Sequence, residues 1–179
     1  KASEDKRSPN IELIGEISKE CFMPLTIGGG INSIKDIGNL LKIGADKISI
    51  NSQAIDNPEF IAQTATKFGS QCIVISIDVK KLGKEHYVFK NRGKINIRKT
   101  AIQWAKEAEK LGAGEILLTS IDRDGTMAGY DLDLIKKITS SVSIPVIACG
   151  GAGKVKDMVN AVKIGGADAV SLASMFHYS

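Results

Sequence analysis

Short apolar runs alternate with amphipathic stretches along this chain of 179 residues, and the alternation predicts an α/β fold built on a parallel sheet. The runs are rich in Ile, Val and Leu and are nearly uninterrupted, as strands covered on both faces are. A second observation is that one strand–turn–helix–strand pattern occurs twice with nearly the same residues. We expect strands at residues 23–28, 47–51, 72–78, 115–121, 144–150 and 169–174.

The stretches between these runs have the spacing of amphipathic helices. Helices are expected after Asn10 and after Ser33, which can both act as N-caps. Another begins with Asn57 as its cap and Pro58 at the first helical position. Segment 80–96 interrupts the alternation with glycines around an apolar core, which predicts a hairpin. Further helices are predicted within residues 98–114, 131–139 and 154–166.

Composition excludes several classes of protein. A net charge of +4 without a dense basic tract argues against a nucleic-acid partner. No apolar stretch is long enough to cross a bilayer and the first residues lack a signal peptide, so we expect a cytoplasmic protein with no membrane association. Three cysteines without CxxC spacing predict neither disulfides nor a zinc site, and we expect Cys72 and Cys149 to be buried. Neither His86 nor His177 belongs to a metal-ligating pattern, so no metal or cofactor is expected.

The repeat pairs "PLTIGGGINSIKDIGNLLKIGADKISINS", residues 24–52, with "PVIACGGAGKVKDMVNAVKIGGADAVSLAS", residues 145–174. Two diverged copies of this unit are typical of a (β/α)₈ barrel assembled from two halves, rather than of a stacked solenoid. The length favours one domain over residues 1–179.

The glycine pairs of the two copies predict two anion-binding turns. Glycine lets a backbone approach an anion closely, and the amides at the start of the next helix supply donors. Because the loops after barrel strands share one rim, two such turns predict a ligand with a phosphate at each end. The alternative is that the glycines only form tight turns. The residues are Gly29 and Gly30 in one copy and Gly150 and Gly151 in the other.

Two acids stand at predicted strand ends. Asp78 closes the run "IVISID", and Asp124 follows "LLTSI" in "DRDGT". Carboxylates at the carboxyl ends of barrel strands project into the mouth of the barrel, where a pair can act as general base and general acid. Asp is also common at strand ends for turn hydrogen bonds, which is the role we expect for Asp122.

The strings "PLTIGGGI", "GADKISIN", "FGSQCIVISID", "GAGEILLTSIDRDGT", "GYD" and "IACGGAGK" resemble the cyclase subunit of imidazole glycerol phosphate synthase, over essentially all 179 residues. The resemblance implies an α/β (β/α)₈ TIM barrel of the ribulose-phosphate-binding type. It also implies a cytoplasmic lyase of histidine biosynthesis that uses ammonia from a glutaminase partner, with which it forms a heterodimer. The implied substrate is a bisphosphate, phosphoribulosyl-formimino aminoimidazole carboxamide ribotide. The products are imidazole glycerol phosphate and aminoimidazole carboxamide ribotide.

By the same resemblance, Asp78 matches a catalytic aspartate and Asp124 a nearby acid that contributes to the reaction. The matching ammonia-entry and partner-facing positions are Asp46, Lys47 and Glu115. Positions that match phosphate or substrate contacts are Gly29, Gly30, Asn51, Ser52, Thr119, Gly125, Thr126, Gly150, Gly151, Ala173 and Ser174.

The chain departs from the family pattern at its ends. Relative to that pattern it begins after the second strand and stops before the last helix, so we expect a barrel lacking the first two strands, with their catalytic aspartate, and the last helix. The simplest hypothesis is that these residues belong to a longer polypeptide, since an open arc leaves two sheet edges exposed. The opening "ASEDKRSPN" also resembles a paralogous branch that serves amidation of bacterial surface sugars. A third possibility is a non-catalytic scaffold or activator of a glutaminase.

Overall fold

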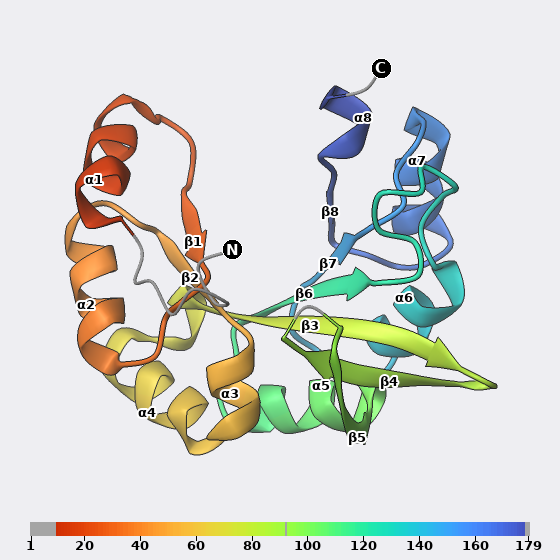
Figure 1. Cartoon of the computed structure of the whole chain (residues 1–179), viewed down its shortest axis with the longest axis horizontal. Coiled ribbons are helices and arrows are strands. Elements are labelled where there is room, and N and C mark those ends of the chain that lie inside the picture. Colours follow the sequence, from red (N-terminus) through yellow and green to blue (C-terminus); the bar gives the residue numbers. More distant parts are fainter. Residues whose placement is uncertain (1–9, 92, 178–179) are drawn as a thin grey trace.

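The structure is a computed structural model that describes residues 10–91 and 93–177. Six parallel strands form one continuous sheet in chain order, interrupted only by a hairpin after the third of them (Figure 1). The predicted strands are therefore confirmed. They are β1 (Thr26–Gly28), β2 (Lys47–Ile50), β3 (Ile73–Leu82), β6 (Glu115–Ser120), β7 (Val146–Cys149) and β8 (Ala169–Ser171).

Helices follow the strands and lie along the outer side of the curled sheet (Figure 1). The arrangement is that of part of a (β/α)₈ barrel, as the alternation and the repeat predict. The longer helices are α1 (Ile11–Glu20), α2 (Ile34–Lys42), α4 (Glu59–Phe68), α5 (Ala101–Lys110), α6 (Leu132–Thr139) and α7 (Val155–Lys163). Short elements that the sequence did not predict are α3 (Ser52–Asp56), the 3₁₀ turn η1 (Ser70–Cys72) and α8 (Ser174–His177).

The helix starts follow local capping chemistry. The side chains of Asn10 and Ser33 each accept a hydrogen bond from the backbone N–H three residues on, as predicted. The predicted cap at Asn57 is wrong. Asn57 instead ends α3, where its N–H donates to the carbonyl of Gln53 at 3.0 Å, and α4 begins after Pro58 without a side-chain cap.

A three-stranded antiparallel extension grows from the far half of β3. Strand β4 (Glu85–Lys90) pairs with β3, and β5 (Ile95–Thr100) pairs with β4. The predicted hairpin is confirmed, although residue 92 lies outside the described part of the chain. The additional strand β5 takes residues that the sequence assigned to a helix, so α5 begins only at Ala101.

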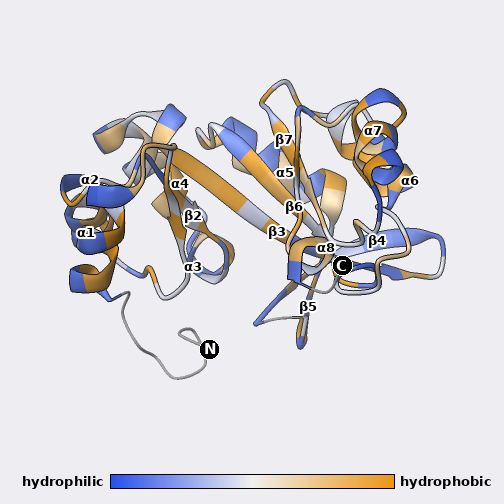
Figure 2. Ribbon diagram, turned by 90° about the horizontal axis from the view of Figure 1, so that it is seen from above, coloured by the Kyte–Doolittle hydropathy of each residue, from blue (hydrophilic) through white to orange (hydrophobic). Residues whose placement is uncertain are grey.

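The two faces of the sheet differ in burial. On β3, Ile75 and Ile77 are completely buried beneath the helices, whereas Ser76 and Asp78 point to the opposite, inner face and are half-buried. Figure 2 shows the apolar character of the strands beside helices of mixed polarity. Burying each Ile contributes about 1.5–3 kcal/mol, and a one-residue slip would exchange the faces. Burial of the isoleucines therefore fixes Asp78 on the inner face.

The repeat has a structural counterpart at the amino ends of its strands. Asp46 Oδ2 accepts a hydrogen bond from the N–H of Leu25 at 2.7 Å, and Asp168 Oδ2 accepts one from the N–H of Val146 at 2.9 Å. In each copy of the repeat, the aspartate lies just before the second strand. Its carboxylate binds the backbone at the start of the first strand, so the two strands are linked there. The two copies thus share side-chain interactions as well as topology.

The sheet is curled and open. Among the described residues, β1 pairs only with β2 and β8 only with β7, and Figure 1 shows these two strands on opposite sides of the molecule. This is the open arc of six strands that the sequence predicts. In the described part of the chain no helix combines the length and apolarity that crossing a membrane requires. The opening segment that carries the paralogue-like residues 2–9 lies outside the described residues.

Candidate active site

A row of polar side chains crosses four neighbouring strands, at or near the carboxyl ends of β6, β7 and β8 and in the middle of β3. Asp78 does not close its strand as predicted, because β3 continues into the hairpin to Leu82. Asp78 on β3 is level with Thr119 on β6, Thr119 with Cys149 on β7, and Cys149 with Ser171 on β8. All four are half-buried, and neighbouring strands lie about 4.8 Å apart. The expectation that Cys149 is buried in the core is wrong. Side chains alternate between the two faces along β7, and the position of Cys149 places it on the inner face with Asp78.

Asp78 occupies an environment that favours its neutral form. Asn51, the residue after β2, donates a hydrogen bond from Nδ2 to Asp78 Oδ2 at 3.0 Å. Burial raises the pKa of Asp78 above its ordinary value; the hydrogen bond from Asn51 opposes this effect and the Asp124 carboxylate adds to it. A raised carboxyl pKa brings proton exchange closer to neutral pH, which general acid–base catalysis requires.

Asn51 has a second polar atom for which the fold supplies no partner. Its Oδ1 is buried and accepts no hydrogen bond within the described part of the chain. Buried polar atoms are nearly always paired in proteins, so an unpaired acceptor beside a carboxyl of raised pKa marks a place for a ligand donor. Sequence analysis proposed Asn51 only from the family resemblance, and the structure adds a physical reason.

The two glycine turns differ in the space around them. Gly29 has φ of +94°, and a Cβ there would meet nothing within 4 Å. Gly151 has φ of +106°, and a Cβ there would lie 2.4 Å from the carbonyl oxygen of Gly129. A Cβ on Gly150 would lie 2.8 Å from the Ser120 carbonyl oxygen. Close packing thus accounts for glycine in the second turn, whereas the space beside Gly29 in the first turn is open.

The helix starts after both turns differ from the expected anion sites. Asp36 Oδ2 accepts the N–H of Ser33 at 3.0 Å, and Asp157 Oδ2 accepts the N–H groups of Gly153 and Lys154 at 3.1 and 3.0 Å. These carboxylates satisfy amides that the sequence interpretation assigned to phosphate. A phosphate at either helix start would therefore compete with these carboxylates for the amides at and just before the N-caps.

The other predicted site residues fall into two groups on either side of β3. Ser52, beside Gly29 and Gly30 at the ends of β1 and β2, donates from Oγ to Asn91 Oδ1 at 3.5 Å. Thr126 belongs to the second group and donates from Oγ1 to the Arg123 carbonyl at 2.7 Å. The second group lies after β6, β7 and β8 and comprises Asp124, Gly125, Thr126, Gly150, Gly151, Ala173 and Ser174.

The opposite end of the same inner face carries an ion pair. Lys47 Nζ contacts Glu115 Oε2 across the start of β3, which separates β2 from β6. The carboxylate is nearly buried, whereas the lysine is about one-third exposed. Asp46, assigned by resemblance to the partner surface, uses one carboxylate oxygen to hold the N–H of Leu25, so it has a structural role in addition.

A tyrosine that sequence reasoning missed secures the far edge of the site. Tyr130 is buried, and its hydroxyl donates to the carbonyl of Ser171 at 3.0 Å. Burial raises the pKa of Tyr130 to about 12, so the phenol stays protonated and remains a donor at neutral pH. The string "GYD" contains this residue, but no pattern indicated that it would reach β8.

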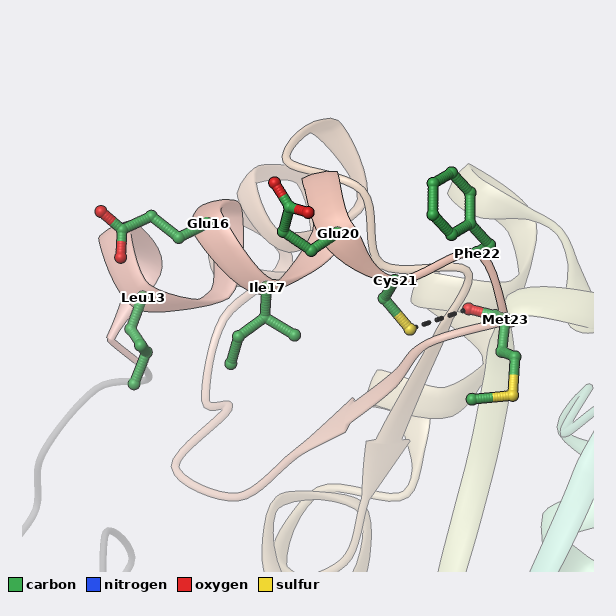
Figure 3. A pocket seen from close by; sticks show the side chains of 7 residues that line it. All are labelled: Leu13, Glu16, Ile17, Glu20, Cys21, Phe22 and Met23. Carbon is green, nitrogen blue, oxygen red and sulfur yellow. Dashed lines mark hydrogen bonds between the residues drawn. The ribbon is translucent and has the colours of Figure 1, made fainter.

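An apolar pocket beside α1 is a different kind of surface (Figure 3). Leu13 and Ile17 of α1 line it together with Phe22 and Met23, which are 98% and 74% exposed. The polar groups shown there are the carboxylates of Glu16 and Glu20 and the Cys21 thiol, which contacts the Met23 carbonyl (Figure 3). Carboxylates repel phosphate, so this pocket does not fit the anionic ligand predicted for the inner face.

The curled parallel sheet, with glycine turns and a raised-pKa carboxyl at the carboxyl ends of its strands, defines a (β/α)-barrel enzyme site. Comparison with known proteins specifies the family. The model of the histidine biosynthesis protein family matches residues 1–179, and the chain belongs to that family. It is 50% identical over 177 residues to imidazole glycerol phosphate synthase subunit HisF of Dehalococcoides mccartyi strain BAV1. It is 51% identical over the same length to the subunit of that name from strain 195. Each match covers 99% of this chain and 70% of the relative.

Proposed function

We propose that this chain carries the cyclase chemistry of imidazole glycerol phosphate synthase in histidine biosynthesis. The proposed reaction combines ammonia with phosphoribulosyl-formimino aminoimidazole carboxamide ribotide, and releases imidazole glycerol phosphate and aminoimidazole carboxamide ribotide. The observation that carries the proposal is the half-buried Asp78, of raised pKa, at the centre of the inner face with a glycine turn on either side. The names of the relatives agree with it.

Each part of the inner face has a proposed role in this reaction. Asp78 exchanges a proton with a substrate nitrogen. Asn51 orients the Asp78 carboxyl through its Nδ2, and the Oδ1 of Asn51 accepts a hydrogen bond from a substrate N–H or O–H. Asp124 contributes negative charge from the adjacent loop, which favours positive charge on the substrate. The turn at Gly29 and Gly30, with Ser52, binds one phosphate. The turn at Gly150 and Gly151, with its neighbouring loops, binds the other.

The Lys47–Glu115 pair is the proposed entrance for ammonia. It lies on the same inner face as Asp78 but at the amino ends of the strands, so a small neutral molecule that passes it reaches the carboxyl-end site from below. The relatives are named as a subunit, which implies a second subunit. We infer that this partner is a glutaminase that docks at the amino ends of the strands, where Asp46 lies.

The test is turnover of the bisphosphate ribotide by the complete polypeptide that the gene encodes, with ammonium chloride as the nitrogen source. We expect imidazole glycerol phosphate and aminoimidazole carboxamide ribotide to form in equal amounts. Chromatography of the reaction mixture over time measures both products. Supply of ammonium bypasses the partner, so the assay isolates the chemistry of the barrel. No turnover, together with activation of a glutaminase by the same preparation, would favour the non-catalytic scaffold over this proposal.

A further inference from the structure

A buried imidazole and two carboxylates meet where the β3–β4 hairpin touches the start of α6. His86 is on β4, Asp131 is the N-cap of α6, and Asp133 is in its first turn. One potential ligand atom from each residue lies within 4.8 Å of the other two. We propose that His86, Asp131 and Asp133 form a binding site for a divalent transition-metal ion, and that Zn²⁺ fits this ligand set best.

The spacing of the ligand atoms supports the proposal. Tetrahedral Zn²⁺ binds imidazole nitrogen and carboxylate oxygen at about 2.0–2.2 Å, which places neighbouring ligand atoms about 3.4 Å apart. His86 Nε2 and Asp131 Oδ2 are 3.2 Å apart, so these two atoms already have that separation. Asp133 is more than half exposed, and a ligand atom of its carboxylate lies within 4.8 Å of the other two. A fourth position then remains for water.

The fold holds the first two ligands in place. Asp131 Oδ1 accepts the N–H of Leu134 at 3.0 Å, which leaves Oδ2 directed at the imidazole. A ligating carboxylate fixed by such a second hydrogen bond is typical of metal sites. The His86 side chain is only 5% exposed, and its Nδ1 has no hydrogen-bond partner among the described residues. Ligation through Nε2 places the ring proton on Nδ1, and burial of the ring holds Nε2 directed at Asp131.

Neighbouring lysines compete with a metal ion for the carboxylates of this site. Lys137 Nζ donates to Asp133 Oδ2 at 2.8 Å, and this exposed pair must open when the ion binds. Exposed ion pairs of this kind contribute little free energy, so their loss opposes binding weakly. Lys81 lies opposite His86 in the hairpin and lines the adjoining cavity with Asp131 and Asp133. The site is therefore not purely anionic, which favours an ion held by imidazole over Ca²⁺ or Mg²⁺.

Metal at this place would connect two parts of the fold that are distant in the sequence. One ligand comes from the hairpin that continues β3, the strand that carries Asp78, and two come from α6. A bound ion stabilises the folded state by an amount that rises with the logarithm of its concentration relative to Kd. We therefore expect Zn²⁺ to raise the melting temperature and to slow amide exchange in β4.

The experiment is titration of the chelator-treated complete polypeptide with Zn²⁺ by calorimetry, repeated with Co²⁺, whose visible spectrum reports the ligand geometry. We expect one equivalent to bind, with Co²⁺ bands typical of four-coordinate nitrogen and oxygen ligation. Asp133→Asn should weaken binding by about tenfold or more, and His86→Gln by at least as much.

Asp56→Asn is the matched control, because Asp56 is 54% exposed and paired with Lys90, as Asp133 is 55% exposed and paired with Lys137. The control should bind Zn²⁺ like the parent. Absence of saturable binding by the parent overturns the proposal, and so does equal affinity in Asp133→Asn and Asp56→Asn. If His86→Gln does not fold, the exposed Asp133 still decides the question.

Discussion

The side-chain amide of Asn51 donates to the carboxylate of Asp78 at 3.0 Å and so links the end of β2 to the middle of β3. This contact is one of the opposing influences on the pKa of Asp78, because burial favours the neutral acid whereas the amide donor favours the anion. The amide of Asn51 thereby makes the pKa of Asp78 lower than burial alone would make it. The predictions below test the roles of the residues on the inner face.

Replacement of Asn51 by Leu should shift the pH dependence of turnover. The substitution removes the donor that lowers the pKa of Asp78, while burial and the Asp124 charge that raise it remain. The acidic limb of the kcat/KM profile should therefore move to higher pH. Asn51→Gln, which can re-form the bond from a longer side chain, should shift the limb less. An unchanged profile in Asn51→Leu would show that Asp78 does not control that limb.

The two glycine turns should respond differently to alanine. Both Gly29 and Gly151 have positive φ, which costs an alanine about 1 kcal/mol, but only at Gly151 does the added Cβ also collide with backbone, at Gly129. Denaturant unfolding of Gly151→Ala should show a loss of about 2 kcal/mol or more. Gly29→Ala should lose about half of that and mainly raise KM for the bisphosphate. Equal losses of stability with unchanged KM would contradict phosphate binding at the first turn.

The outcome of the sequence analysis depended on how local each interaction is. The strands were predictable from their uninterrupted apolar runs, and Asp78 was predictable as the acid that follows the run before it. Its place in the middle of β3 was not, because the hairpin extends this strand to Leu82. Asn10 and Ser33 were predictable as caps, since capping involves residues three apart. The Asn51–Asp78 bond depends on how β2 and β3 are placed side by side, and periodicity carries no information about that.

Other features were missed for related reasons. The cluster of His86 with Asp131 and Asp133 joins segments 45 residues apart, and no spacing rule connects them. Asp36 and Asp157 stand three residues after the N-caps, in the pattern of a capping box. The sequence pattern could therefore have predicted that these carboxylates accept hydrogen bonds from the N-cap amides. The glycine signal before them led to assigning those amides to phosphate instead.

Lys47→Met should separate the two nitrogen sources of the enzyme. The ion pair with Glu115 lies at the amino ends of the strands, far along the sheet from the Asp78 row. We expect glutamine-dependent turnover in the presence of the glutaminase to fall by about tenfold or more, while turnover with saturating ammonium stays close to the parent value. Lys99→Met, which breaks the part-buried pair with Glu107 on the hairpin side, is the matched control and should change neither. Equal loss of both activities in Lys47→Met would contradict an entrance role.

The duplicated aspartates should contribute similarly to stability. Asp46→Ala and Asp168→Ala each leave one strand-start N–H without its acceptor, at Leu25 and Val146. Each should lower the free energy of unfolding by about 1 kcal/mol, and the double variant by about the sum, because the sites are far apart. Urea denaturation of the four proteins measures this. An unchanged free energy of unfolding in both single variants would contradict the structural role assigned to these two aspartates.

The central claim is that the carboxyl of Asp78 exchanges a proton with the substrate, and steady-state turnover of the bisphosphate ribotide with ammonium by Asp78→Asn tests it most directly. The amide keeps the size and the contact with Asn51 but cannot accept a proton, so kcat should fall by about 100-fold or more while KM changes little. Glu107→Gln, the same carboxyl-to-amide change outside the inner face, should retain parental kcat. A kcat of Asp78→Asn within a few-fold of the parent would contradict the account.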